Sequence, residues 1–300
     1  MRTFRPLRFL IAVLFPVTVI LVAPTLHAQQ AAPTPRLLRD IPYVPDAAPR
    51  QHLDLYLPPA TAHPVPLMVW IHGGGWREGS KSDCPARDFM PYGYAAASLE
   101  YRFSQDAPFP AQIQDCKAAI RWLRTHAAEN GIDPNHIGVW GGSAGGHLVA
   151  MLGVTGTETQ FDTAANPGVS SAVQCVIDFF GPTDFLHYGD VPQAKIDAPT
   201  FPLAQLMGGP VSTHQALARS ASPFYFVSKT AAPFLILHGD KDPLVPLQQS
   251  KILAVALTAD GVEATLQIVP GGGHGGPGFN TPQVRQMMLD FANRHLKPKP

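Results

Sequence analysis

The chain of 300 residues carries 22 lysines and arginines against 22 aspartates and glutamates, so its formal net charge is zero. Because the chain has no excess of positive charge to neutralise a phosphate backbone, we expect no nucleic-acid partner. Hydrophobic residues at 45% exclude a disordered chain, while 32 prolines and 26 glycines predict many short elements joined by tight loops.

The N-terminal segment has the pattern of a secretory signal peptide. Three arginines among the first eight residues precede a charge-free apolar run over residues 9–23, and a small residue, Ala28, follows. An uncleaved membrane anchor is the alternative, but the run is shorter than the roughly 20 residues needed to span a bilayer, and Pro16 interrupts it. We therefore expect residues 1–28 to be removed, no stable membrane insertion afterwards, and an exported protein, periplasmic or extracellular. Residues 29–300 are expected to form a single domain.

The three cysteines of this exported chain raise the question of a disulfide. Cys175 lies in an apolar run and is expected to be a packed free thiol. Cys84 and Cys116 could pair in an oxidising compartment or remain separate thiols, and their spacing does not decide between the two. With no close pair of cysteines and no His-x-x-x-His, the sequence predicts no zinc site. We expect neither a metal nor a cofactor.

Short apolar runs alternate with helical patterns along the rest of the chain. The proline-rich segment 29–66 contains one stretch, His52–Leu57, in which polar and apolar residues alternate as in an edge strand with one buried face. Later runs rich in Val, Ile, Leu and Phe fit strands buried on both faces. Strands are expected at 67–71, 95–99, 136–140, 172–180, 234–237 and 264–269, and helices at 112–128, 247–259 and 284–296. This alternation predicts an α/β fold with a mostly parallel, doubly wound sheet.

Residues 181–232 interrupt this alternation. They contain six prolines and no strand pattern, and a connection of this length is too long for an ordinary loop in a compact domain. We interpret the segment as a cap insertion over one end of the sheet. A structural excursion without a functional role is the alternative.

A nucleophile motif follows the strand predicted at 136–140. Residues 141–145, Gly-Gly-Ser-Ala-Gly, match G-x-S-x-G between a strand and a helix, the pattern of a nucleophile elbow. Glycines are needed at the flanks because side chains there would collide with the neighbouring strand and helix. We predict that Ser143 is the nucleophile, presented near a helix N-terminus that favours negative charge. A flexible glycine turn is the alternative.

A run of three glycines follows the strand predicted at 67–71. In His72-Gly73-Gly74-Gly75-Trp76 the glycines let bare N–H groups approach a ligand closely, as in the oxyanion hole of esterases. Ester hydrolysis passes through a tetrahedral oxyanion that such donors stabilise. We expect the amides of Gly74, Gly75 and Ala144, the residue after the nucleophile, to form this hole, with an ordinary glycine-rich turn as the alternative.

The acid and the base are expected in two later loops. Asp242 follows the strand predicted at 234–237, and His274 lies in a glycine-rich loop after the strand predicted at 264–269. The resulting order of Ser143, Asp242 and His274 is that of an α/β-hydrolase. In such a triad the histidine takes the serine proton and the carboxylate orients the imidazole.

Other residues compete for these roles or for the substrate pocket. Alternative acids are Asp240 and Asp184, and alternative bases are His238 and His72. A histidine at a strand end more often stabilises a loop, and His147 is expected to pack within its helix. The candidates for lining a pocket are Trp76, Phe180, Phe185 and Phe279, with plain core packing as the alternative.

Taken together, these motifs resemble the BD-FAE branch of the α/β-hydrolases, bacterial esterases near the hormone-sensitive-lipase group. The resemblance covers about residues 50–296 and rests on the segments 72–76, 101–104, 109–123, 141–147 and 238–246. It implies the nucleophile, acid and base at Ser143, Asp242 and His274, and the oxyanion hole at Gly74, Gly75 and Ala144. The proline-rich residues 191–202 depart from the family pattern, so the resemblance does not carry over a substrate.

We therefore predict a secreted serine carboxylic-ester hydrolase without a cofactor. Its expected partner is a small-molecule or saccharide ester, such as an acetyl or feruloyl ester of plant polysaccharide. A general short-chain carboxylesterase or lipase is the alternative. A serine peptidase is less favoured, although residues 238–246 also resemble prolyl-oligopeptidase relatives, and so is a non-catalytic binding module. The sequence does not specify the oligomeric state.

Overall fold

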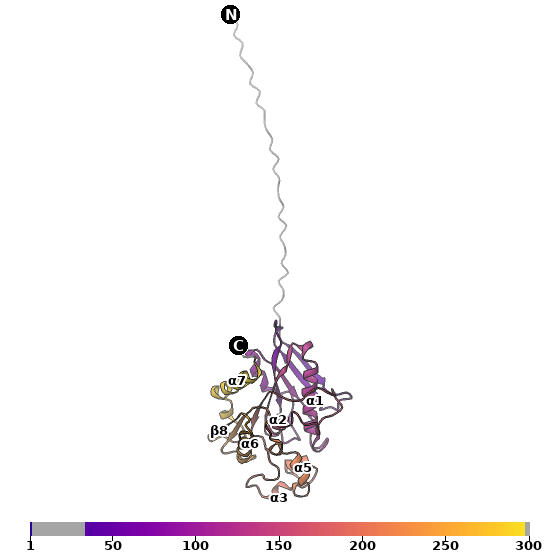
Figure 1. Cartoon of the computed structure of the whole chain (residues 1–300), viewed down its shortest axis with the longest axis vertical. Helices are drawn as coiled ribbons and strands as arrows, with labels where there is room; N and C mark the ends of the chain where they lie inside the picture. Colours follow the sequence, from indigo (N-terminus) through magenta and orange to yellow (C-terminus); the bar gives the residue numbers. More distant parts are fainter. Residues whose placement is uncertain (2–33, 298–300) are drawn as a thin grey trace. The chain divides into compact units, whose positions relative to one another are not determined.

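An eight-stranded sheet forms the centre of the computed structural model, which describes Met1 and residues 34–297 (Figure 1). The strands are β1 (Arg36–Pro42), β2 (His52–Leu57), β3 (Val65–Ile71), β4 (Ala95–Leu99), β5 (Ile132–Gly142), β6 (Cys175–Phe179), β7 (Phe234–Gly239) and β8 (Ala264–Val269). They lie in the order β1-β2-β4-β3-β5-β6-β7-β8. Apart from Met1, the predicted signal peptide falls outside the described residues.

The sheet is mostly parallel, as predicted. The pairs β1–β2 and β2–β4 are antiparallel, and every pairing from β4 to β8 is parallel. The carboxyl ends of β3, β5, β7 and β8 therefore meet at one edge. The motifs at 72–76, 141–145, 238–242 and 271–276 all follow these ends and are gathered there.

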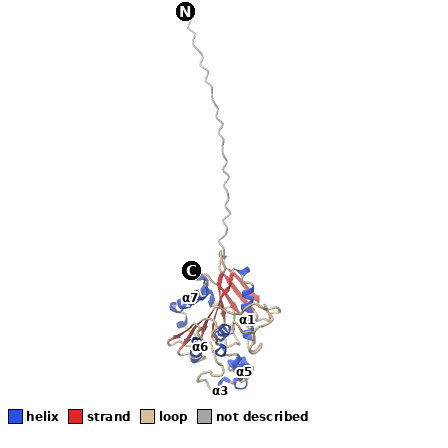
Figure 2. Ribbon diagram, in the orientation of Figure 1, coloured by secondary structure: helices blue, strands red, loops and turns tan. Residues whose placement is uncertain are grey.

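Helices lie on both sides of the sheet (Figure 2). They are α1 (Ala111–Thr125), α2 (Ala144–Val154), α3 (Gln193–Ile196), α4 (Pro202–Met207), α5 (Gln215–Ser220), α6 (Gln248–Ala259) and α7 (Pro282–Leu296). Short 3₁₀ segments occupy Pro85–Tyr92, Ala128–Asn130, Val211–Thr213, Pro223–Phe226 and Pro277–Phe279.

Successive strand residues face opposite layers of the core. Val139 packs in one cluster with side chains of α1, α2 and α6, whereas its neighbour Trp140 packs in a second cluster with α7. Burial on both faces is why these strands read as continuous apolar runs.

The prediction that β2 is an edge strand was wrong. β1 pairs with its outer side, and Asp54, whose polarity suggested an exposed face, is buried. The Asp54 carboxylate lies 2.7 Å from Lys81 Nζ and accepts the Asp40 backbone N–H at 2.9 Å. Ion pairing thus lets a polar residue occupy a covered position.

The segment between β6 and β7 holds three short helices, α3 to α5, and contacts the loops at the carboxyl edge of the sheet. Arg77, after β3, donates hydrogen bonds to Thr200 O at 3.2 Å and Gln205 Oε1 at 3.0 Å. Phe109, after β4, donates its amide to Leu206 O at 2.9 Å. Figure 1 shows α3 and α5 close together at the bottom of the view. The segment lies where the sequence placed a cap.

The structure decides between the two alternatives for the cysteines. Cys84, Cys116 and Cys175 are all free and buried, so Cys84 and Cys116 form no disulfide here. Among the described residues no helix is long and apolar enough to cross a membrane.

Candidate active site

Ser143 occupies a strained turn between β5 and α2. Its φ of 57° and ψ of −120° place a non-glycine residue in a rarely populated region. A Cβ atom at Gly145 would lie 2.0 Å from Ile71 O, and one at Gly141 would lie 2.4 Å from Gly145 O. The Ser143 amide donates to Phe179 O at 2.8 Å. The two flanking glycines therefore permit a turn that a side chain would block.

The glycine run after β3 passes directly beside this serine. A Cβ atom at Gly73 would lie 2.7 Å from Gly142 O and 3.4 Å from Ser143 Cβ. Gly74, Gly75 and Trp76 then have successive positive φ values of 106°, 58° and 56°. Ala144 begins α2, so its amide has no acceptor within the helix. The three amides predicted for the oxyanion hole thus belong to two segments that meet at Ser143.

Asp242 and His274 form a hydrogen-bonded pair. His274 Nδ1 lies 2.7 Å from Asp242 Oδ2, and because a carboxylate only accepts, Nδ1 carries the hydrogen. His274 Nε2 is then the free basic nitrogen. The two loops are tied together, since Lys241 N donates to Gly272 O at 2.9 Å and Gly271 N donates to Asp240 Oδ1 at 2.7 Å.

The Asp242 carboxylate accepts three hydrogen bonds and lies close to a second histidine, His238. Its Oδ1 accepts the amides of Leu244 and Val245 at 2.8 and 2.9 Å, and its Oδ2 lies 3.3 Å from His238 Nε2 as well as near His274. Burial opposes ionisation, but the N–H groups of His238, His274 and the two amides outweigh it and hold the pKa of Asp242 well below its ordinary value. Asp242 is therefore a fixed negative charge beneath His274.

His238 is the contributor to this group that sequence reasoning treated only as a rival base. It is fully buried, with Nε2 2.9 Å from Val245 O and Nδ1 2.7 Å from Ser250 Oγ. Its hydrogen bonds fix the loop that carries Asp242. The signal available in the sequence is the spacing of four residues between His238 and Asp242 at the end of a strand.

The remaining rivals form local hydrogen bonds instead. Asp184 Oδ2 pairs with His187 Nδ1 at 2.9 Å and not with His274. Asp240 binds the amide of Gly271. His72 Nδ1 donates to Gly73 O at 2.8 Å, and its ring stacks on Tyr101 with centroids 4.5 Å apart. Burial lowers the pKa of His72 and keeps the ring neutral.

The four aromatic pocket candidates divide into two pairs. Phe180 lies against His274, with ring centroids 4.5 Å apart, and Phe279 lies 5.0 Å from Phe180. A Cβ atom at Gly142 would lie 3.5 Å from Phe180, so this ring adjoins both the elbow and the base. Trp76 and Phe185, only 3% and 1% exposed, pack on each other and leave little surface for a ligand.

A buried carboxyl, Asp178 on β6, lies beside the elbow and was not singled out by the sequence. Its Oδ1 accepts the amide of Gly181 at 2.9 Å, and a Cβ atom at Gly146 would lie 2.4 Å from it. Burial raises the pKa of Asp178 to about 7, against the lowering effect of the Gly181 hydrogen bond and of His238. Its isolated position within an apolar run gave no sign of this environment.

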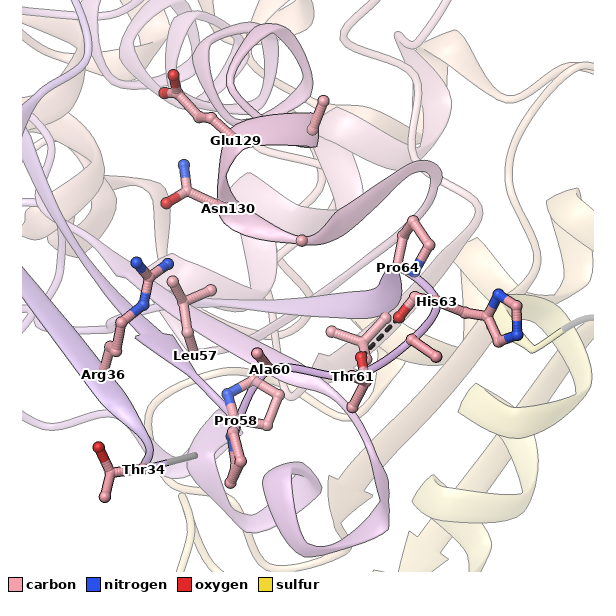
Figure 3. A pocket seen from close by; sticks show the side chains of 15 residues that line it. Thr34, Arg36, Leu57, Pro58, Ala60, Thr61, His63, Pro64, Glu129 and Asn130 are labelled. Atoms are coloured by element: carbon pink, nitrogen blue, oxygen red, sulfur yellow. Dashed lines mark hydrogen bonds between the residues drawn. The ribbon is translucent and has the colours of Figure 1, made fainter. Parts of the chain in front are cut away.

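A surface hollow of about 640 Å³ lies at the opposite end of the sheet (Figure 3). It is lined by the end of β2, the start of β3 and the turn before β5, including Leu57, Val65 and Asn130. The elbow is at the other end of β5, so this hollow is remote from Ser143. In the described part of the chain no group of three or more His, Cys, Asp or Glu side chains could hold a metal ion.

The BD-FAE family model matches residues 53–257, which is more than half of the chain. The chain belongs to the BD-FAE family. Among named relatives, esterase LipQ of Mycobacterium tuberculosis is 33% identical over 77% of this chain and 54% of its own length. Esterase LipC of the same organism is 30% identical over 71% of this chain and 53% of its own length. The chain thus spans about half the length of these relatives.

Solved structures of esterases share this BD-FAE fold. A truncated carbohydrate esterase from gut microbiota has a TM-score of 0.79 at 33% identity, over 88% of this chain and 97% of the other. An acetyl ester-xyloside bifunctional hydrolase from Caldicellulosiruptor lactoaceticus has a TM-score of 0.71 at 26% identity, over 88% and 98% of the two chains. The predicted α/β-hydrolase fold is thereby confirmed.

Proposed function

We propose that this BD-FAE protein is a serine carboxylic-ester hydrolase that uses Ser143, His274 and Asp242. The observation that supports the proposal most strongly is the strained elbow at Ser143, which shares one edge of the sheet with a hydrogen-bonded histidine–aspartate pair. Relatives named esterases add to this support.

The geometry suggests how each group would act. His274 Nε2 takes the proton of Ser143 as its oxygen attacks the ester carbonyl, and the ionised Asp242 stabilises the resulting imidazolium. The amides of Gly74, Gly75 and Ala144 receive the oxyanion, aided by the N-terminus of α2. His274 then protonates the leaving alcohol. Water, deprotonated by His274, then attacks the acyl-enzyme, and His274 returns the proton to the Ser143 oxygen as the bond to the acyl group breaks and the acid leaves.

We expect the hydrogen bond between Ser143 and His274 to form when the substrate binds. Within the described residues no hydrogen bond joins these two side chains. The ring of Phe180 adjoins both the elbow and His274. Catalytic hydrogen bonds are often long in ligand-free enzymes and shorten in the Michaelis complex.

The substrate that we propose is a short-chain ester of a saccharide, with an acetyl group as the preferred acyl group. The similarity to the carbohydrate esterase and to the acetyl ester-xyloside hydrolase supports this choice, and so does the bulky ring of Phe180, which lies beside His274 and is backed by Phe279. We further propose, from the N-terminal pattern, that residues 1–28 direct export and are cleaved. N-terminal sequencing of the exported protein should find Gln29 first, and recovery of the uncleaved chain would contradict this.

Activity measurements on the purified protein and on Ser143→Ala test the function. The protein should release acetate from acetylated xylo-oligosaccharides, hydrolyse p-nitrophenyl acetate faster than the octanoate, and be labelled by a fluorophosphonate probe. Ser143→Ala should lose labelling and nearly all turnover while keeping its circular dichroism spectrum. Turnover at the wild-type rate in Ser143→Ala would overturn the mechanism, and preference for methyl ferulate or octanoate would overturn the substrate.

A further inference from the structure

We propose that His147 is a positioning residue that holds the oxyanion loop, residues 72–76, in place against the nucleophile elbow through its contact with Trp76. The proposal rests on the proposed function, because it concerns the hole that would receive the oxyanion. It assigns a role to a histidine that the catalytic mechanism above does not use.

His147 is fully buried and its two ring nitrogens have different partners. Nε2 lies 2.7 Å from Ala221 O, and Nδ1 lies 3.1 Å from Trp76 Nε1. A carbonyl only accepts and an indole N–H only donates, so Nε2 carries the hydrogen and Nδ1 is bare. One neutral tautomer satisfies both contacts. Burial stabilises that form by lowering the pKa of His147 to about 4.

These contacts join three segments that are distant in the sequence. The His147 amide donates to Ser143 O at 2.9 Å, which fixes the ring one helical turn after the nucleophile. Trp76 directly follows Gly75 in the oxyanion loop. Ala221 lies at the end of α5, in the insertion between β6 and β7. A hydrogen bond on each side of one ring therefore links the elbow helix to the oxyanion loop and to the insertion.

The backbone conformation of Trp76 indicates that its hydrogen bond to His147 does more than fill the core. Its φ of 56° is uncommon for a bulky residue, and such strain persists only where surrounding contacts impose it. The Trp76 carbonyl accepts from Ser104 N at 2.7 Å, and its ring packs on Phe185. The bond to His147 ties this strained residue to the helix that begins at the nucleophile. Without it, the preceding amides of Gly74 and Gly75 would lose a fixed position relative to Ser143.

Two substitutions separate the two hydrogen bonds of His147. In His147→Asn, the amide oxygen takes the place of Nδ1 and can still accept from Trp76, while the donor to Ala221 is lost. In His147→Gln, the longer side chain places its nitrogen near Nε2 and can still donate to Ala221, while the acceptor for Trp76 is lost. Each variant loses one buried hydrogen bond, so the two should lose similar stability.

If His147 acts through Trp76, the two variants should differ in kcat. Complete loss of an oxyanion donor costs about 10²–10³ in kcat, so a displaced loop should cost about 10-fold or more. We expect such a loss with little change in KM for His147→Gln, and less than about 3-fold for His147→Asn, on the same scale. A trifluoromethyl ketone forms an oxyanion on the serine, so its inhibition constant should rise in His147→Gln by the factor by which kcat/KM falls.

Trp76→Phe tests the same bond from the other side, because it removes the N–H and keeps an aromatic ring. It should resemble His147→Gln, and the double variant should be no slower than either single one. This route stays open if a His147 variant does not fold. Thr155→Val is the matched control, since Thr155 donates a buried hydrogen bond to Met151 O at 2.6 Å at the far end of α2. It should lower Tm without changing kcat.

Equal losses of kcat in the Asn and Gln variants, or additive effects in the double variant, would overturn the positioning role. So would losses of kcat that simply follow Tm across all the variants, Thr155→Val included. These outcomes are distinct from failure of the proposed function, in which the wild-type protein shows no turnover that depends on Ser143.

Discussion

Burial of a neutral histidine at position 147 should make the folded state less stable as the pH falls. The pKa of His147 is lowered by burial from 6.5 to about 4 in the folded protein. Between these values the unfolded chain binds a proton that the folded chain excludes, so the contribution of His147 to stability is highest above pH 6.5 and declines as the pH falls to about 4. The gap between the two pKa values corresponds to about 3 kcal/mol of unfolding free energy.

Urea unfolding of the wild-type protein and of His147→Asn, followed by far-ultraviolet circular dichroism from pH 7.5 to pH 4, measures this effect. Every other group titrates in both proteins, so the difference between their unfolding free energies isolates position 147. The wild-type advantage at neutral pH, due to the lost hydrogen bond, should shrink by about 3 kcal/mol on acidification. A difference that is constant with pH would show that His147 is not held neutral, and would refute the reasoning.

Three further predictions concern residues of the candidate active site and its surroundings. Asp178→Asn should show the opposite slope, gaining stability over the wild type by about 4 kcal/mol from pH 4 to pH 7, because the folded carboxyl has a raised pKa of about 7; urea unfolding measures it. Gly73→Ala places a Cβ atom 2.7 Å from Gly142 O and should lower kcat about 10-fold, whereas Gly142→Ala, with 3.5 Å to its nearest neighbour, should change kcat far less. Asp242→Asn should lower kcat by about 10³–10⁴ with the fold retained, because the amide no longer fixes the His274 tautomer; an unaltered kcat would exclude Asp242 as the acid.

Much of the sheet could be predicted because its strands are covered on both faces. Their apolar runs were recognisable, and their ends located the functional loops. The strand β1 was missed because it lies in a segment where prolines mask the pattern, and its absence turned β2 into a false edge. Phe180, assigned to a strand in the sequence, instead leaves β6 with a φ of 45°. This turn brings the Phe180 ring beside His274, and no pattern in the neighbouring sequence predicts the turn.

The candidate site was predictable where chemistry requires a particular residue in a particular turn. Glycines at 73, 141 and 145 approach backbone atoms so closely that only a hydrogen fits in place of a side chain. Such constraints restrict these positions to glycine and can therefore be recognised in the sequence. The bond between His147 and Trp76 cannot be recognised in this way, because 71 residues separate the two and either could be an ordinary core residue. Contacts between remote segments become visible only when the fold brings them together.

His147 and Asp178, the two buried titratable groups next to the elbow, have opposite effects on how stability changes with pH. As the pH falls from about 6.5 to about 4, the neutral His147 costs stability, while Asp178 gains it by taking up a proton that the unfolded chain does not yet bind. Over this range the two contributions to stability therefore oppose each other in the wild-type protein, and each single variant removes one of them. Between about pH 4 and pH 7 both groups are mainly uncharged in the folded state, so the ionised Asp242 is the charge that acts on His274 there.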